Sequence, residues 1–222
     1  MSAGSDWNIA FPEELSHDFV RCVELIGLYL YKKYGLIGMW GLDSIWDDKR
    51  FVFNELNCRF LGSTEVSSIN QWQRGIPPFY GTHLLIFDNY VVNWMPSAGE
   101  FNRETVRLMN NIKDSRPFYL KIKVKTSKPV RISNKLSGSG IYKIVSDCSL
   151  KKLNDRIVTS GADFDNDEIL LANLPEKETL CYPGSQLCTV EGITRKRNIF
   201  DGAHKLSHKG RQLINVLYQY FI

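Results

Sequence analysis

Apolar positions recur with a helical period over residues 11–34. Pro12 suits the first turn of a helix, because the N–H that it lacks would have no partner there. Lys32 and Lys33 place positive charge near the carboxyl end, and Gly35 follows where helices commonly stop. The spacing therefore predicts a long helix with one continuous apolar stripe, formed by Phe11, Leu15, Phe19, Val23, Ile26 and Leu30.

After this helix the pattern changes to that of an extended chain. Residues 36–46 are rich in small and apolar side chains, residues 47–50 are polar, and residues 51–57 begin with an apolar run. Two such runs joined by a four-residue polar link predict a β-hairpin. A short helix over residues 65–73 is expected to follow it.

Weaker patterns fill the rest of the chain. The expected elements are a hairpin over residues 84–92 turning at Asp88-Asn89, a helix over 100–113, strands over 118–125, 141–146 and 186–192, and a final helix over 207–221. The alternating Lys121, Lys123 and Lys125 are typical of a charged edge strand, although a phosphate or carrier-protein contact would use the same pattern. The change to loop-rich sequence near residue 115 predicts two domains, 1–115 and 116–222.

Polar side chains converge on the first predicted hairpin. Glu55 and Asn57 are two residues apart on a strand, so they share a face, and Asp43 on the facing strand can lie beside them. Two carboxylates and an amide oxygen are ligands that suit Mg²⁺. Arg59 adds a planar cation for a phosphate or a carboxylate. The set points to nucleotide chemistry, whereas the alternative is that Asp43 and Glu55 simply pair with nearby Lys or Arg at a sheet edge.

Composition narrows the class of protein but not its function. With 222 residues, 43% hydrophobic and 23% charged, the chain is long and apolar enough for a globular core. A net charge of +4 is too mild to indicate nucleic acid, and no run of about 18 apolar residues predicts a membrane span. Five cysteines without a C-x-x-C pair indicate reduced, buried thiols, and the first residues lack the pattern of a secretion signal, so we expect a cytoplasmic protein.

The predicted helix and hairpin together resemble a known superfamily. The long helix, then residues 35–43 (GLIGMWGLD), 51–59 (FVFNELNCR) and 62–64 (GST), is similar to the C-terminal lobe of ATP-grasp ligases. The resemblance implies that Asp43, Glu55 and Asn57 bind Mg²⁺, with Mn²⁺ as a substitute, and that Glu55 and Asn57 thereby hold ATP. It also implies that Arg59 is a catalytic residue that contacts the acyl phosphate or the carboxylate substrate. Weaker similarity to ATP-grasp peptide and amino-acid ligases lies in Gly140-Ile141-Tyr142, Tyr182-Pro183-Gly184 and Leu206-Ser207-x-x-Gly210.

The fold that this resemblance implies is α+β: a C-terminal ATP-grasp lobe, made of an antiparallel sheet with helices, followed by a small α+β extension. The implied function is Mg-ATP-dependent ligation of a small carboxylate to an amine, such as an amino acid or peptide. The lobe that grips adenine lies upstream in this superfamily, so we expect a separate polypeptide to supply it, or the chain to be a truncated, excised or degenerate piece. The alternative is a non-catalytic binding or assembly module that keeps an ATP-grasp-like scaffold. Neither nucleic acid nor a membrane is an expected partner.

Overall fold

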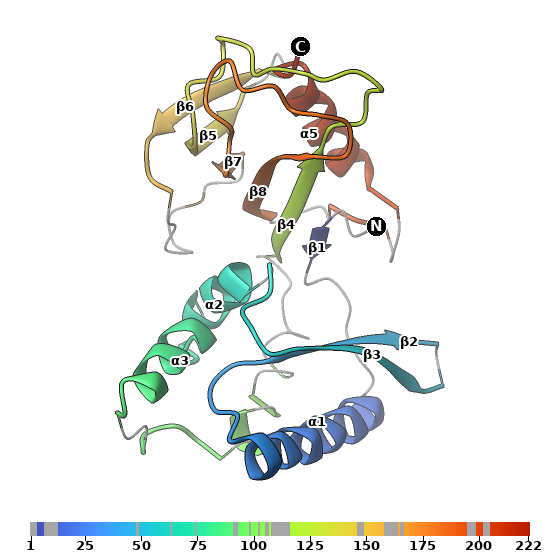
Figure 1. Cartoon of the computed structure of the whole chain (residues 1–222), viewed down its shortest axis with the longest axis vertical. Coiled ribbons are helices and arrows are strands. Elements are labelled where there is room, and N and C mark those ends of the chain that lie inside the picture. Colours follow the sequence, from blue (N-terminus) through green and yellow to red (C-terminus); the bar gives the residue numbers. More distant parts are fainter. Residues whose placement is uncertain are drawn as a thin grey trace. The chain divides into compact units, whose positions relative to one another are not determined.

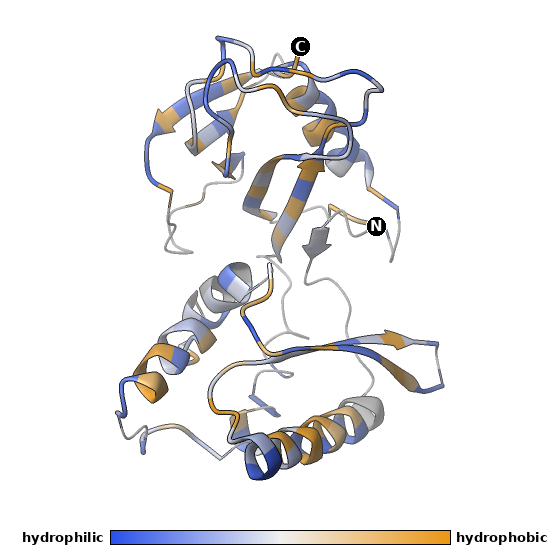
Figure 2. Ribbon diagram, in the orientation of Figure 1, coloured by the Kyte–Doolittle hydropathy of each residue, from blue (hydrophilic) through white to orange (hydrophobic). Residues whose placement is uncertain are grey.

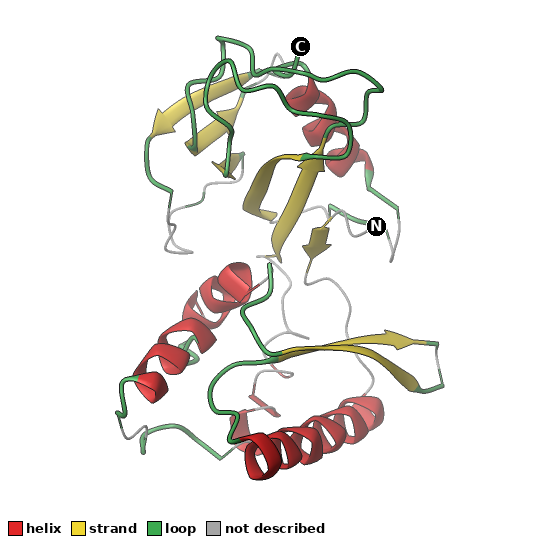
Figure 3. Cartoon of the chain, in the orientation of Figure 1, coloured by secondary structure: helices red, strands yellow, loops and turns green. Residues whose placement is uncertain are grey.

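The structure of the protein is a computed structural model with an α+β architecture, as predicted (Figure 3). It describes residues 4–6, 13–47, 49–62, 64–73, 75–90, 93–97, 99–101, 103–104, 107, 116–145, 149–157, 164, 167–194, 199–201 and 205–222. The chain divides into two compact units (Figure 1). We call Ile9–Ile112 the N-terminal unit, and Met1–Asn8 together with Lys113–Ile222 the C-terminal unit. No described helix is long and apolar enough to cross a membrane.

A six-stranded sheet forms the base of the C-terminal unit, and its neighbouring strands all run antiparallel. The strands lie in the order β1 (Gly4–Asp6), β4 (Arg116–Lys123), β8 (Gln186–Thr194), β7 (Glu168–Ala172), β5 (Gly140–Ile144) and β6 (Leu150–Asn154). The ribbons of β4 and β8 alternate between hydrophilic and hydrophobic colours in Figure 2. This alternation gives the sheet an apolar face that a helix can cover.

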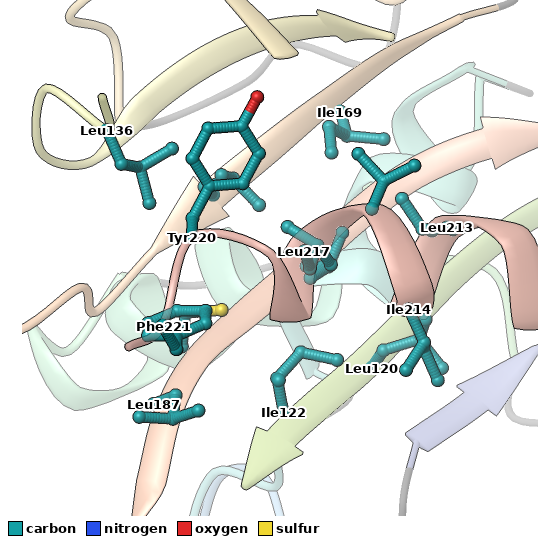
Figure 4. Close-up of a cluster of buried hydrophobic side chains, with 14 of the residues drawn as sticks. Leu120, Ile122, Leu136, Ile169, Leu187, Leu213, Ile214, Leu217, Tyr220 and Phe221 are labelled. Carbon is teal, nitrogen blue, oxygen red and sulfur yellow. The ribbon is translucent and has the colours of Figure 1, made fainter. Parts of the chain in front are cut away.

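The helix α5 (His208–Tyr218) covers this apolar face and completes the largest hydrophobic core. Figure 4 shows Leu213, Ile214 and Leu217 of α5 gathered with Leu120 and Ile122 of β4. The predicted start of the helix is confirmed, because the Oγ of Ser207 accepts a hydrogen bond from the N–H of Gly210 at 3.0 Å. Gly210 is required for a close approach, since a Cβ at this position would lie 2.3 Å from the carbonyl oxygen of Ile199.

The expected strands near residues 118, 141 and 186 are confirmed as β4, β5 and β8, whereas β1, β6 and β7 were not expected. The interpretation of Lys121, Lys123 and Lys125 as marks of an edge strand holds in part. β4 lies between β1 and β8, but β1 pairs only with Phe118, Tyr119 and Leu120. Among the described residues, Lys121 and Lys123 pair with β8 alone, and Lys125 follows the end of β4.

The N-terminal unit combines a long helix, a hairpin and shorter helices. The long helix α1 (Glu13–Tyr34) and the hairpin strands β2 (Gly41–Trp46) and β3 (Phe51–Asn57) confirm the first predictions, followed by α2 (Thr64–Gln73) and α3 (Phe79–Phe87). Phe19 of α1 packs on Phe51 and Phe53 of β3, with ring centroids 4.6 and 6.1 Å apart. Phe19, from the predicted apolar stripe of α1, therefore meets the hairpin, whereas Phe11 of that stripe lies outside the described residues.

A hairpin over residues 84–92 was expected, and this prediction is wrong. The segment up to Phe87 belongs to α3, and Asn89 adopts a left-handed conformation with φ of 58°. The N–H of Asn89 bonds the carbonyl of Ile86, and the N–H of Tyr90 bonds that of Leu85, which is the Schellman pattern that ends helices. Asp88-Asn89 therefore ends a helix, because the same turn residues serve both kinds of structure.

The helix expected over residues 100–113 is described only in part. Residues 99–101, 103–104 and 107 are helical, and the predicted continuation lies outside the described residues. Ser97 and Glu100 form a capping box at its start: the N–H of Ser97 donates to the Glu100 carboxylate at 3.0 Å, and the N–H of Glu100 donates to the Ser97 hydroxyl at 3.3 Å. The Ser97 hydroxyl also donates to this carboxylate at 2.7 Å, and this bond is the largest cause of the lowered pKa of Glu100, followed by the bond from the Ser97 N–H.

Candidate functional site

The β2–β3 hairpin places the predicted metal ligands side by side. Asp43 lies directly opposite Glu55, and Gly41 lies directly opposite Asn57. Because side chains alternate along a strand, Asp43, Glu55 and Asn57 share one face of the hairpin, as predicted. The Nδ2 of Asn57 lies 3.5 Å from the Oδ2 of Asp43, at the outer limit of a hydrogen bond.

A bulge and a turn set this register. The pairing shifts between Asp43 and Ser44, so that β3 carries the extra residue Asn54 beside Glu55. At the far end of the hairpin, the Oδ1 of Asp47 accepts the backbone N–H groups of Lys49 and Arg50 at 3.2 and 3.0 Å. These two bonds, that from Arg50 being the larger cause, lower the pKa of Asp47. Asp47, the first residue of the polar link, thus stabilises the turn of the hairpin.

The electrostatic environment of the pair favours a cation. Asp43 and Glu55 are exposed and Asn57 is buried. Two carboxylates directly opposite each other on a sheet repel each other. Within the described part of the chain, neither carboxylate forms an ion pair with a Lys or Arg, so the alternative of simple sheet-edge pairing finds no support there. A bound cation would remove the repulsion.

The donor set fits a hard divalent ion but does not make a complete cage. Two carboxylates and one amide oxygen leave other coordination positions for phosphate oxygens or water, which is how Mg²⁺ commonly binds. The amide of Asn57 directs its nitrogen toward Asp43 in this structure, so ligation through Oδ1 requires the amide to turn over. Among the described residues, no group of three or more His, Cys, Asp and Glu side chains is arranged to hold a metal.

Arg59 follows the hairpin without joining the carboxylates. Its side chain is exposed, and its Nη1 donates to the carbonyl oxygen of Phe60 at 3.2 Å. This bond uses one of the five guanidinium donors. The structure therefore brings Asp43, Glu55 and Asn57 together. Arg59 lies next to them in the chain but forms no ion pair with either carboxylate in the described part of the structure.

His83 supports the chain that leads into β2. Its Nδ1 accepts the N–H of Met39 at 2.9 Å, and its ring packs against Phe60 and Phe87 at 4.5 Å. Gly38 has φ of +86°, and a Cβ there would lie 2.5 Å from that same nitrogen. The chain before Gly41 is therefore held by α3 rather than extended, which is why β2 starts later than the expected residue 36. A lone histidine gives no sign of such a contact in the sequence.

The expectation that the cysteines are buried holds only in part. Cys181 and Cys188 are buried, Cys22 is half-buried and Cys58, between Asn57 and Arg59, is exposed. All four are free thiols, and Cys148 lies outside the described residues. Cys58 is exposed because β3 ends at Asn57 and the chain bends away from the hairpin.

Comparison of the chain with protein-family models, curated proteins and solved structures found no match.

Proposed function

We propose that this chain is the metal-binding C-terminal part of a Mg-ATP-dependent carboxylate–amine ligase of the ATP-grasp type. One observation carries the proposal: the hairpin register sets Asp43 against Glu55, with Asn57 beside them on the same face. Mg²⁺ is the ion that this donor set suits, and Mn²⁺ can replace it. The small carboxylate and amine substrates belong to the same proposal.

In this proposal the three hairpin residues would hold the ion, which would supply charge neutralisation at the phosphates of ATP when the carboxylate substrate is activated as an acyl phosphate. Asp43 and Glu55 would approach the ion from the two strands, and the bulge at Asn54 fixes how they face each other. Arg59 would bind the acyl phosphate or the carboxylate substrate through donors that are not engaged with Phe60. The His83 contact to Met39 holds the chain that leads into β2 and so helps to position Asp43.

The N-terminal unit is poor in buried apolar side chains, which supports the need for a second lobe. Among its described residues, Leu30, Ile76 and Phe101 are the buried hydrophobic side chains. A two-stranded hairpin is at best marginally stable unless further strands or a helix cover it. We infer that a separate polypeptide or segment supplies the lobe that grips the nucleotide.

Metal binding is the first test, because it needs no partner. Titration of the full chain with Mn²⁺, followed by electron paramagnetic resonance and calorimetry, is expected to show one site that Glu55→Gln and Asp43→Asn each weaken at least tenfold. Glu24→Gln, at an exposed carboxylate on α1, is the matched control and should leave the affinity unchanged. If the chain binds no Mn²⁺, or if both hairpin variants bind as well as the wild type, the metal assignment fails. The non-catalytic module then becomes the better hypothesis.

Turnover is the second test, because turnover requires the whole enzyme, including any partner that supplies the second lobe. The chain would be purified from its native host with any bound partner, and ATP hydrolysis would be screened over amino acids and peptides. Glu55→Gln in the reconstituted complex is expected to abolish Mg²⁺-dependent turnover. Unchanged turnover in that variant would overturn the assignment even if Mn²⁺ binds.

A further inference from the structure

A second apolar stripe runs along α1, on the side away from its buried stripe. Leu25, Leu28 and Tyr29 keep 59%, 49% and 52% of their surfaces exposed, whereas Leu30 is buried. Isolated exposed leucines are ordinary on protein surfaces. Three large apolar side chains within five residues of one helix form a continuous patch, because residues three and four apart are neighbours on a helix surface.

Charged residues continue this stripe in both directions. Positions 18, 21, 25, 28 and 32 follow one another at alternating spacings of three and four residues, which is the spacing of a helix-pairing seam. Asp18 stands at the amino end of this seam, and its side chain keeps 82% of its surface exposed. Lys32 stands at the carboxyl end and is exposed. The seam thus has Asp18 at its amino end, Leu25 and Leu28 in the middle and Lys32 at its carboxyl end, with Arg21 between Asp18 and Leu25.

We propose that a second copy of this chain covers the seam, with the two α1 helices antiparallel around a twofold axis at Leu25. In this arrangement residue i of one copy faces residue 50 − i of the other. Leu25 then meets Leu25 of the second copy, Leu28 meets Cys22, and Asp18 meets Lys32. Each contact between unlike residues occurs twice, because a twofold interface uses the same patch on both copies.

The charges favour this partner and this direction over other occupants. A parallel pair would place Asp18 against Asp18 and Lys32 against Lys32, whereas the antiparallel pair joins opposite charges and also opposes the helix dipoles favourably. A membrane surface would favour a uniformly basic helix face, and Asp18 and the nearby Glu24 do not fit that chemistry. The inference uses only α1 and is independent of the proposed ligase function.

Sedimentation velocity of the full chain over a wide concentration range tests the proposal. The wild type is expected to form a concentration-dependent dimer, and Leu25→Glu is expected to remain monomeric at every concentration. Tyr31→Glu is the matched control, since Tyr31 lies on the same helix, is also 59% exposed and is off the seam. This control should dimerise as the wild type does. Circular dichroism melting of each variant shows that the fold is retained.

Charge reversal then tests the antiparallel direction. Asp18→Lys and Lys32→Asp are each expected to raise the dimer dissociation constant by roughly tenfold, because each removes two exposed ion pairs and adds repulsion. The combined reversal restores both pairs and is expected to recover wild-type affinity. A wild type that stays monomeric, a dimer that survives Leu25→Glu, or a double reversal that recovers nothing each overturns the proposal.

Discussion

Cys188 lies on β8 beneath α5, where none of its surface is exposed. Burial raises the pKa of this thiol from its ordinary value of 9.0 to about 12, because a thiolate would lose its hydration. Burial also raises the pKa of nearby Tyr218, whose hydroxyl donates to the carbonyl oxygen of Lys123 at 2.7 Å. The core of the C-terminal unit is thus built to hold both groups in their neutral forms.

The raised pKa of Cys188 predicts a loss of stability in alkaline solution. Below pH 9 the thiol is neutral in both the folded and the unfolded chain, so it confers no pH dependence. Between pH 9 and 12 only the unfolded chain loses the proton, and the free energy of unfolding should fall by on the order of 1 kcal/mol per pH unit. We expect Cys188→Ala to remove this part of the fall in urea unfolding followed by circular dichroism at pH 8 and 10.

Cys58→Ala serves as the control for that experiment, since its thiol is exposed. It should lose stability with pH in parallel with the wild type, because lysines and tyrosines titrate in both. If the free energy of unfolding of Cys188→Ala also falls with pH in parallel with that of the wild type, the buried thiol does not cause the loss of stability in alkaline solution.

At the scale of elements, the N-terminal unit depends on well-defined ends of its helices and of its hairpin. Asp47 closes the β2–β3 turn, Ser97 and Glu100 cap the helix that follows α3, and Asn89 ends α3. Among these, Asn89 stands in the left-handed region, which Gly tolerates freely and β-branched residues hardly at all. The direction of the chain after α3 therefore depends on one residue.

Substitution of Asn89 is expected to separate backbone strain from side-chain effects. Asn89→Gly should leave the free energy of unfolding of the N-terminal unit unchanged or slightly higher, whereas Asn89→Val should lower it by about 1–2 kcal/mol. Trp40, Trp46, Trp72 and Trp94 all lie in this unit, so tryptophan fluorescence during urea unfolding reports mainly on it. Asp88→Ala, at a residue with φ of −87°, is the control and should cost much less than Asn89→Val.

At the scale of the whole molecule, the two units differ in how much apolar surface they bury. Apart from Leu30, Ile76 and Phe101, the buried hydrophobic side chains of the described residues belong to the C-terminal unit. Its β8 is buried from Leu187 to Thr194, between β4 and β7. Stability should therefore be uneven along the chain, since local opening is easiest where few apolar contacts are lost.

Hydrogen exchange monitored by mass spectrometry should reveal this difference. Amides of β4 and β8 are expected to exchange far more slowly than those of β2 and β3, because the hairpin has two strands and an exposed outer face. The lobe proposed to complete the ligase, or the proposed α1 pairing, would slow exchange in the N-terminal unit. Equal protection of β3 and β8 in the isolated chain would contradict the unequal cores.

The sequence by itself determined the local elements and the carboxylate face. The apolar period of α1, the polar link at residues 47–50 and the cap at Ser207 are signals contained within a few residues, so they predicted their elements correctly. The shared face of Asp43, Glu55 and Asn57 followed from strand alternation and short hairpin closure. The roles of these residues, and that of Arg59, remain predictions.

Only the tertiary structure decided the features that depend on contacts distant in sequence. β1 has three residues, too few to show a strand pattern, so the sequence does not reveal its pairing with β4. The hydrogen bond from Met39 to His83 joins two segments that no sequence pattern connects. The apolar run before Asp88 is compatible with either a strand or a helix from its sequence alone. The backbone hydrogen bonds of the structure show that it forms the helix α3. The exposed stripe of α1 could likewise be identified only from the structure, which packs Phe19, on another side of the helix, against the hairpin. Hydrophobicity in a sequence does not say which apolar side chains stay exposed to water.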